Sequence, residues 1–124
     1  MAFTSTSRWI AGTGAVLLLA VAADSLVPVA FQLRLGLHWL IEHFLAYFAV
    51  TFLLCLALPR PYFVAAGLMA IAAALEALQG LTADRIPDVP TAFCGAAGVL
   101  VASLAASLVT EAWQRWQARA SLSS

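Results

Sequence analysis

Charged residues are scarce in this chain of 124 amino acids, and lysine is absent altogether. Six arginines and six acidic residues make up 10% of the sequence, against about 25% in an ordinary globular domain. Hydrophobic residues account for 64%, and the mean hydropathy is +0.97. Such a composition excludes an intrinsically disordered chain. The few charges cannot cover the wetted surface of a soluble domain of this size, so the composition indicates an integral membrane protein.

Other absences narrow the functional classes. The formal net charge is zero and no basic stripe exists, which excludes a nucleic-acid partner of the usual kind. Two cysteines are too few for a disulfide scaffold, and no Cys/His spacing resembles a zinc site. The sequence has no glycine-rich phosphate loop and no G-x-S-x-G or H-E-x-x-H motif. We therefore expect no cofactor and no metal, and we expect membrane lipids as partners; a homo-oligomer or a larger membrane complex stays open.

Uncharged runs separated by prolines mark the predicted membrane spans. A transmembrane helix needs about 20 mostly apolar residues, and a charge near one end can sit at the interface. Prolines 28, 59, 61, 87 and 90 fall at the breaks between runs, where a helix end suits them. The predicted helices cover residues 8–28, 36–58, 61–81 and 90–112. Because four strands cannot close a barrel, we predict an all-α fold: one transmembrane domain over residues 1–124, folded as an integral membrane four-helix bundle.

The arginines predict the orientation of this bundle. An even number of spans puts both termini on one side of the membrane, together with Arg8, Arg60, Arg115 and Arg119, whereas Arg34 and Arg85 lie on the other. The positive-inside bias then favours cytoplasmic termini in a multi-pass protein of the cytoplasmic (inner) membrane. Five of the six acidic residues fall on the outer side, and these are Asp24, Glu42, Glu76, Asp84 and Asp88.

Small residues are concentrated in the last two predicted helices. Segments 61–81 and 90–112 are rich in alanine and glycine at spacings of three and four. Such spacing allows two membrane helices to approach closely. We therefore expect these two helices to form the centre of the bundle. Cys55 and Cys94 are expected far apart, as small apolar fillers.

Several polar residues fall within or beside the predicted spans, where ionisable groups are costly and point to function. Glu76 follows fifteen uncharged residues, and Gln79 lies three residues later on the same helix face. His43 and Tyr47 are four apart and share a face of another helix. With the charged segment 84–88, they form the candidate site on the outer side: His43, Tyr47, Glu76, Gln79, Arg85 and Asp88.

The residue types suggest two interpretations of this candidate site. A carboxylate paired with Arg85 stays ionised in the membrane, and Arg85 can hold a phosphate or carboxylate with two hydrogen bonds. His43 can carry a proton and Tyr47 can donate a hydrogen bond. Alternatively, Glu76, Arg85 and Asp88 act as a polar staple between the outer loop and the bundle. Composition does not separate the two. Interfacial roles are expected for His38 and Glu42, and we assign Asp24 no chemistry.

The order of these residues resembles the VanZ-like family of small bacterial membrane proteins. The shared features are a His-Phe with a tyrosine four residues after the histidine (His43 and Tyr47), a Glu-x-x-Gln, an arginine six residues on, an aspartate three after that, and a small-residue helix start at Gly95-Ala96. The resemblance covers about residues 38–100. It implies a role in the bacterial cell envelope, because founding members are associated with low-level resistance to the glycopeptide antibiotic teicoplanin.

Three functional hypotheses follow, in order of preference. The first is an accessory membrane protein whose outer polar site binds the headgroup of an envelope lipid or a glycopeptide. The second is a structural subunit of a larger membrane complex. The third is an intramembrane enzyme acting on an envelope lipid, with Glu76 or Asp88 as the base, His43 as a second acid/base group and Arg85 as the anion stabiliser.

Overall fold

The computed structural model describes residues 5–58, 60–82, 84 and 86–122, and this part of the chain is helical. Four α-helices follow one another: α1 (Ser5–Leu26), α2 (Trp39–Ala57), α3 (Pro61–Gln79) and α4 (Val89–Leu122), with a short 3-10 helix, η1 (Val29–Phe31), after α1. Each α-helix is long and apolar enough to cross a membrane. The predicted all-α class is confirmed, as are four helices that could each span a membrane, and the chain is a multi-pass membrane protein by helix length and composition.

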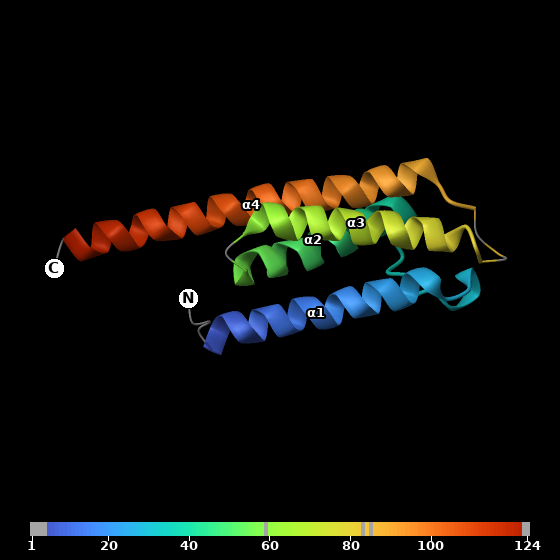
Figure 1. Cartoon of the computed structure of the whole chain (residues 1–124), viewed down its shortest axis with the longest axis horizontal. Helices are drawn as coiled ribbons and strands as arrows, with labels where there is room; N and C mark the ends of the chain where they lie inside the picture. Colours follow the sequence, from blue (N-terminus) through green and yellow to red (C-terminus); the bar gives the residue numbers. More distant parts are fainter. Residues whose placement is uncertain (1–4, 59, 83, 85, 123–124) are drawn as a thin grey trace.

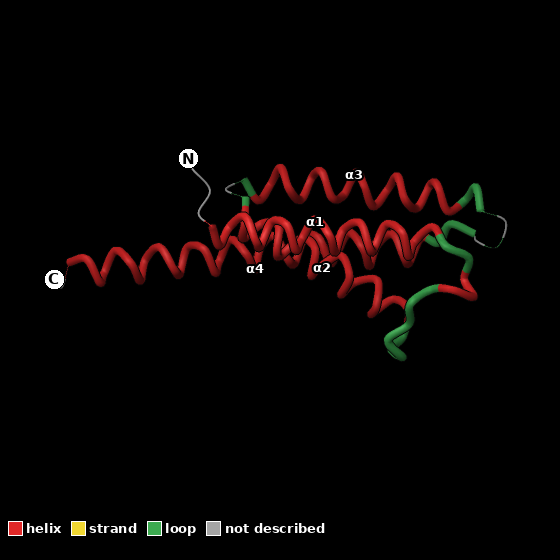
Figure 2. The backbone as a smooth tube through the Cα atoms, turned by 90° about the horizontal axis from the view of Figure 1, so that it is seen from below, coloured by secondary structure: helices red, strands yellow, loops and turns green. Residues whose placement is uncertain are grey.

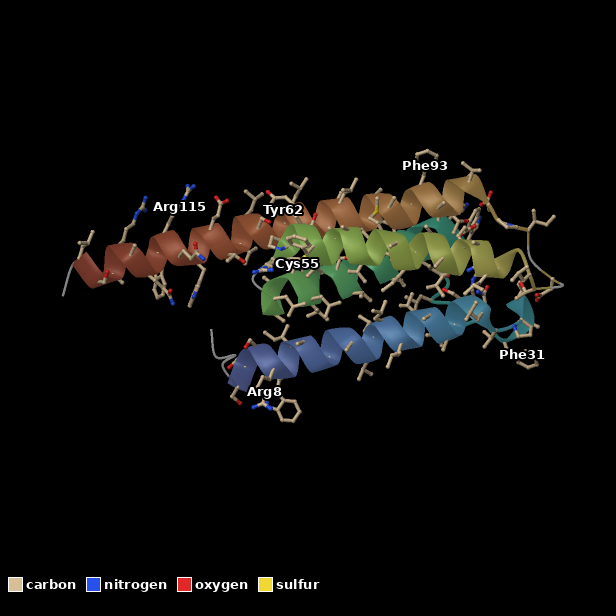
Figure 3. The ribbon with its side chains drawn as sticks, viewed as in Figure 1. Arg8, Phe31, Cys55, Tyr62, Phe93 and Arg115 are labelled. Carbon is tan, nitrogen blue, oxygen red and sulfur yellow. The ribbon has the colours of Figure 1, made fainter. Side chains whose placement is uncertain are left out.

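The four helices run up and down beside one another (Figure 1). The α1–α2 and α3–α4 connections therefore lie at the same end of the bundle, which we call the loop end. Helix α1 begins and α4 ends at the opposite end, the terminal end (Figure 1). Figure 3 shows Arg8 and Arg115 toward the terminal end and Phe31 and Phe93 toward the loop end. This arrangement gathers residues from all four helices at the loop end, although they are far apart in sequence.

Local signals explain where the helices begin. Pro61 occupies the first turn of α3, where its missing N–H costs nothing and its fixed φ suits the helix. His38 caps α2, because its Nδ1 accepts a hydrogen bond of 3.3 Å from the backbone N–H of Leu40. Asp88 directly precedes α4, and its carbonyl accepts the N–H of Ala92 at 3.1 Å. Helices α1, α2 and α3 begin or end up to three residues from the predicted bounds.

Helix α4 is much longer than predicted. Its 34 residues replace the predicted span of 90–112 and give a length of about 51 Å at 1.5 Å per residue. From residue 108 onward every described side chain of α4 is exposed, and this part projects beyond the other helices (Figure 2). The projecting part carries an ion pair of 3.3 Å between Glu111 and Arg115, one helical turn apart. The ten residues beyond the predicted span form a regular helix rather than a separate tail.

The closest packing joins α2 to α4, which corrects the expectation that α3 and α4 form the centre. The buried stripe of α4 consists mainly of small residues: Gly95, Gly98, Val99, Ala102, Ser103 and Ala106. A Cβ atom on Gly98 would lie 2.5 Å from the carbonyl oxygen of Phe44, and one on Gly95 would lie 3.2 Å from the Tyr47 ring. The small residues of α4 therefore admit the backbone and large side chains of α2, instead of pairing with the small residues of α3.

The outer helices pack against this pair on narrow faces. Leu68 and Leu75 lie on one buried face of α3, and Leu68 belongs to the same core cluster as Tyr47, Val50 and Val99. Helix α1 approaches α2 at Gly14, where an added Cβ would come within 2.8 Å of the Leu54 side chain. Most of the α1 and α3 surface is left exposed and apolar, as expected for helices that face lipid.

Candidate functional site

A cavity of about 730 Å³ lies at the loop end. Its walls come from α1, the 27–38 connection, α2, the end of α3, the α3–α4 connection and the first turn of α4. The polar groups that line it are Asp24, Ser25, Gln32, Arg34, Glu42, His43, Glu76, Gln79, Asp84, Asp88 and Thr91. A volume in this range is typical of small-molecule sites.

The cavity is polar near the loops and apolar farther in. Leu17, Val21, Ala46 and Ala49 line its inner part, and they lie up to nearly three turns from the loop-end termini of α1 and α2. The carboxylates come instead from the last turns of α1 and α3, the first turn of α2 and the connections. The cavity therefore offers an amphiphile a polar headgroup site and an adjoining apolar wall.

Glu42 organises the connection between α1 and α2. Its Oε1 accepts the backbone N–H groups of Leu35 at 2.8 Å and Leu37 at 3.1 Å, and its Oε2 lies 3.2 Å from Nε of Arg34. Gly36, between the two leucines, has a φ of +80°, which L residues rarely adopt. This turn lets both amides converge on one oxygen. Glu42 is therefore a structural anchor, in addition to lining the cavity.

Two aspartates fix the same connection at other points. The Oδ1 of Asp24 accepts the backbone N–H of Leu33 at 2.7 Å. The Oδ2 of Asp84 accepts the N–H of Val29 at 2.8 Å, which joins the α3–α4 connection to η1. The two connections therefore meet over the loop end. The sequence interpretation assigned Asp24 no chemistry and left Asp84 out of the candidate site, whereas both line the cavity.

Glu76 and Asp88 join the end of α3 to the start of α4. The backbone N–H of Asp88 donates to Oε1 of Glu76 at 2.8 Å, and the hydroxyl of Thr91 donates to Oδ2 of Asp88 at 2.8 Å. These bonds are what the staple interpretation predicts. Both carboxylates also line the cavity, so the geometry supports the staple without excluding a ligand.

Gln79 is the most unusual polar group of the site. The residue is only 8% exposed and lines the cavity. Its backbone carbonyl accepts the N–H of Thr82 at 3.0 Å and the Thr82 hydroxyl at 2.7 Å. Its side-chain amide makes no hydrogen bond with the residues that the structure describes. A buried amide of this kind is rare in folded proteins, because burying it without a partner costs free energy.

The rings of His43 and Tyr47 pack against each other in a tilted arrangement on α2. Their ring centroids are 5.0 Å apart at an interplanar angle of 54°. His43 lines the cavity, whereas Tyr47 is 1% exposed and lies in the core. Gly95 of α4 leaves room for both rings. Tyr47 therefore supports the position of His43 rather than contacting the cavity.

The structure thus brings four of the six candidate residues to one cavity: His43, Glu76, Gln79 and Asp88. Tyr47 packs beneath them, and Arg85 lies outside the described residues. Sequence reasoning missed Asp24, Glu42 and Asp84 as cavity residues. The signal that pointed to them was the common location of the five acidic residues on one side of the membrane.

Within the described ranges, no three His, Cys, Asp or Glu side chains are arranged to hold a metal ion. Cys55 and Cys94 are both free thiols. Cys55 is buried near the α2–α3 turn, where its Sγ lies 3.8 Å from the carbonyl oxygen of Pro61, and Figure 3 places it away from the loop end.

Comparison with protein-family models, curated proteins and solved structures finds no match for this chain. The fold and the cavity define its class on their own: a multi-pass α-helical membrane protein with an acidic cavity at its loop end.

Proposed function

We propose that the protein binds the polar headgroup of a membrane amphiphile in the loop-end cavity. The observation that carries this proposal is Gln79, a cavity residue whose buried amide has no partner among the described residues. A bound headgroup with donors and acceptors supplies such a partner and offsets the cost of burying the amide. The apolar inner wall, with Leu17 and Val21, accommodates the adjoining hydrocarbon chain.

The proposed role is accessory rather than catalytic, in the cytoplasmic membrane of a bacterium. It rests on the resemblance to the VanZ-like family at His43, Tyr47, Glu76 and Gln79, which stays a prediction. On this proposal the amphiphile is a lipid or glycopeptide of the cell envelope, and binding affects envelope physiology or antibiotic resistance. Arg8 and Arg115 lie toward the terminal end (Figure 3), Arg60 directly precedes α3, and Arg119 lies in the last turn of α4. The positive-inside bias therefore favours a cytoplasmic terminal end and a cavity in the outer leaflet.

This orientation predicts which residues an impermeant thiol reagent reaches. In a background with Cys55→Ala and Cys94→Ala, we expect Leu81→Cys to be labelled on right-side-out spheroplasts and Ser121→Cys only after lysis. Leu81 is 83% exposed at the loop end, and residue 121 lies on the exposed end of α4. Labelling of Ser121→Cys without lysis, with Leu81→Cys protected, would reverse the orientation and move the cavity to the inner leaflet.

The binding proposal predicts that wild-type protein, purified in a neutral polyoxyethylene detergent, retains about one amphiphile per chain. Native mass spectrometry reads this directly. We expect Gln79→Met to lose about tenfold in occupancy, because methionine keeps the shape of glutamine but removes its hydrogen bonds. Gln117→Met is the matched control, since Gln117 lies on the exposed part of α4.

Two outcomes would contradict the binding proposal. One is that the wild type retains no amphiphile and takes none up when total bacterial lipid is added back. The other is equal retention of the amphiphile by the wild type and Gln79→Met. The melting temperatures of Gln79→Met and Gln117→Met are measured as well. If they equal that of the wild type, a loss of amphiphile in Gln79→Met is not caused by general unfolding.

A second candidate function, a structural subunit of a larger complex, is favoured by the outer face of α3. This face is exposed and made of small residues: Ala66, Gly67, Ala70, Ala73 and Ala77. A Cβ on Gly67 would meet nothing within 4 Å, so another helix can approach there. A homo-oligomer or a stoichiometric partner in the same native mass spectra would support this function.

A further inference from the structure

We infer that the headgroup held in the loop-end cavity carries a primary ammonium group. The inference rests on the proposed function and names the chemical class of its ligand. Five carboxylates line the cavity: Asp24, Glu42, Glu76, Asp84 and Asp88. Among the described lining residues Arg34 is the one arginine, and none is a lysine. Carboxylates still outnumber arginines by five to two when Arg85 of the same loop is added from the sequence.

Arg34, the one arginine among the described lining residues, does not balance these charges. Arg34 is paired with Glu42, whose two oxygens also serve the backbone amides of the connection. Ionised carboxylates that are gathered at the edge of a membrane repel one another and lose solvation. A cation in the cavity lowers this electrostatic cost, whereas a phosphate or carboxylate increases it.

The acceptors in the cavity have capacity left for such a cation. Glu76, Asp84 and Asp88 each use one carboxylate oxygen in the bonds described above. The second oxygen of each accepts no hydrogen bond from the part of the chain that the structure describes. These three oxygens come from the last turn of α3 and from the α3–α4 connection.

The amide of Gln79 is the independent observation that points to a ligand. It lies one turn after Glu76 on α3 and is buried against the same cavity without a partner among the described residues. The side-chain carbonyl oxygen of Gln79 adds a neutral hydrogen-bond acceptor to those of the carboxylates. A primary ammonium offers three N–H donors to such a set of acceptors, whereas a quaternary ammonium offers charge but no donor.

The headgroup preference can be measured on the wild-type protein alone. The probes share one dodecyl chain and differ in the headgroup: dodecylammonium, dodecyltrimethylammonium, dodecyl phosphate and dodecyl glucoside. Each is titrated into protein in the neutral detergent, and occupancy is read by native mass spectrometry. Ethylammonium is a fifth probe, which separates an amphiphile site from a site for a free amine.

We expect dodecylammonium to bind at least tenfold more tightly than dodecyl phosphate and dodecyl glucoside, and several-fold more tightly than the trimethyl compound. Ethylammonium should bind at least tenfold more weakly than dodecylammonium, because it does not reach the apolar wall. Equal or tighter binding of the phosphate or the glucoside would overturn the ammonium inference and leave the amphiphile proposal intact. The absence of binding by every probe would overturn both.

Variants then assign the binding to this cavity. Glu76→Gln keeps an acceptor for the N–H of Asp88 but removes the charge, and we expect about a tenfold loss of dodecylammonium affinity with little change for dodecyl glucoside. Glu111→Gln is the matched control, because Glu111 is exposed on the far end of α4. An unchanged ammonium preference in Glu76→Gln and Gln79→Met would place the ammonium elsewhere and refute the inference.

Discussion

A methyl group added at position 98 is expected to lower the free energy of unfolding by about 1–3 kcal/mol, the usual range for overpacking a close contact. In Gly98→Ala the new Cβ would lie 2.5 Å from the carbonyl oxygen of Phe44 and 3.2 Å from the backbone nitrogen of Phe48. Both atoms belong to the backbone of α2, so no side-chain rotation relieves the contact. Helices α2 and α4 must separate, which weakens the closest packing of the bundle. Unfolding of the protein in mixed detergent and SDS micelles measures the loss.

Gly67→Ala provides a matched control for this prediction. Gly67 is also a helical glycine, but a Cβ there meets nothing within 4 Å. The substitution should stabilise the protein by up to about 1 kcal/mol, because alanine is the better helix former. Similar effects of the two substitutions would show that helix propensity, rather than the α2–α4 contact, decides the outcome. They would then contradict the packing described here.

Glu42→Ala is expected to destabilise the loop end by about 2 kcal/mol. One carboxylate holds Arg34 and the amides of Leu35 and Leu37, and its side chain is only 14% exposed. Hydrogen bonds to charged groups contribute about 1.5–3 kcal/mol each. When Glu42 is removed, hydrogen bonds from the exposed amides to water offset part of the lost stability. Amide hydrogen exchange should rise over residues 32–38 in particular, and the melting temperature should fall.

Glu111→Ala removes the other glutamate that forms an ion pair with arginine in the described chain. That pair joins Glu111 to Arg115 at 3.3 Å on the surface of α4, with side chains 58% and 75% exposed. Exposed pairs of this kind contribute at most about 1 kcal/mol. If Glu42→Ala and Glu111→Ala lower the melting temperature equally little, Glu42 is an interfacial charge and not a structural anchor.

Sequence reasoning was most successful where one physical constraint dominates. The apolar runs and the prolines between them predicted four spanning helices, because a bilayer requires every backbone polar group to be paired within a helix. The prediction of α4 was too short because it followed the same hydrophobic signal. The hydrophobic span ends near residue 112, but the Ala, Gln and Arg residues beyond it favour helix without needing a membrane.

The partner of α4 was not predictable from its small residues alone. Glycine and alanine show that something approaches closely, but not whether the neighbour is small or large. The neighbour is α2, whose Tyr47 and Val50 are almost fully buried. Glycine on one helix complements a bulky surface on the other, so counting small residues in both helices favoured α3 wrongly.

The candidate site was predicted best where its residues lie on helices. Spacing along α2 and α3 placed His43 beside Tyr47 and Glu76 beside Gln79 on shared faces. The roles of Glu42 and Asp24 depend on how the 27–38 connection folds back over the loop end. A single left-handed glycine and several backbone amides decide that fold, and these leave little signal in the sequence.

The most direct test of amphiphile binding is an experimental structure of the protein in bacterial membrane lipid, at a resolution that shows the Gln79 side chain. We expect density for an amphiphile in the loop-end cavity, with a headgroup atom within about 3.2 Å of the Gln79 amide. The hydrocarbon chain should lie along Leu17 and Val21. A cavity closed by protein side chains, with the Gln79 amide bonded to the chain itself, would contradict it.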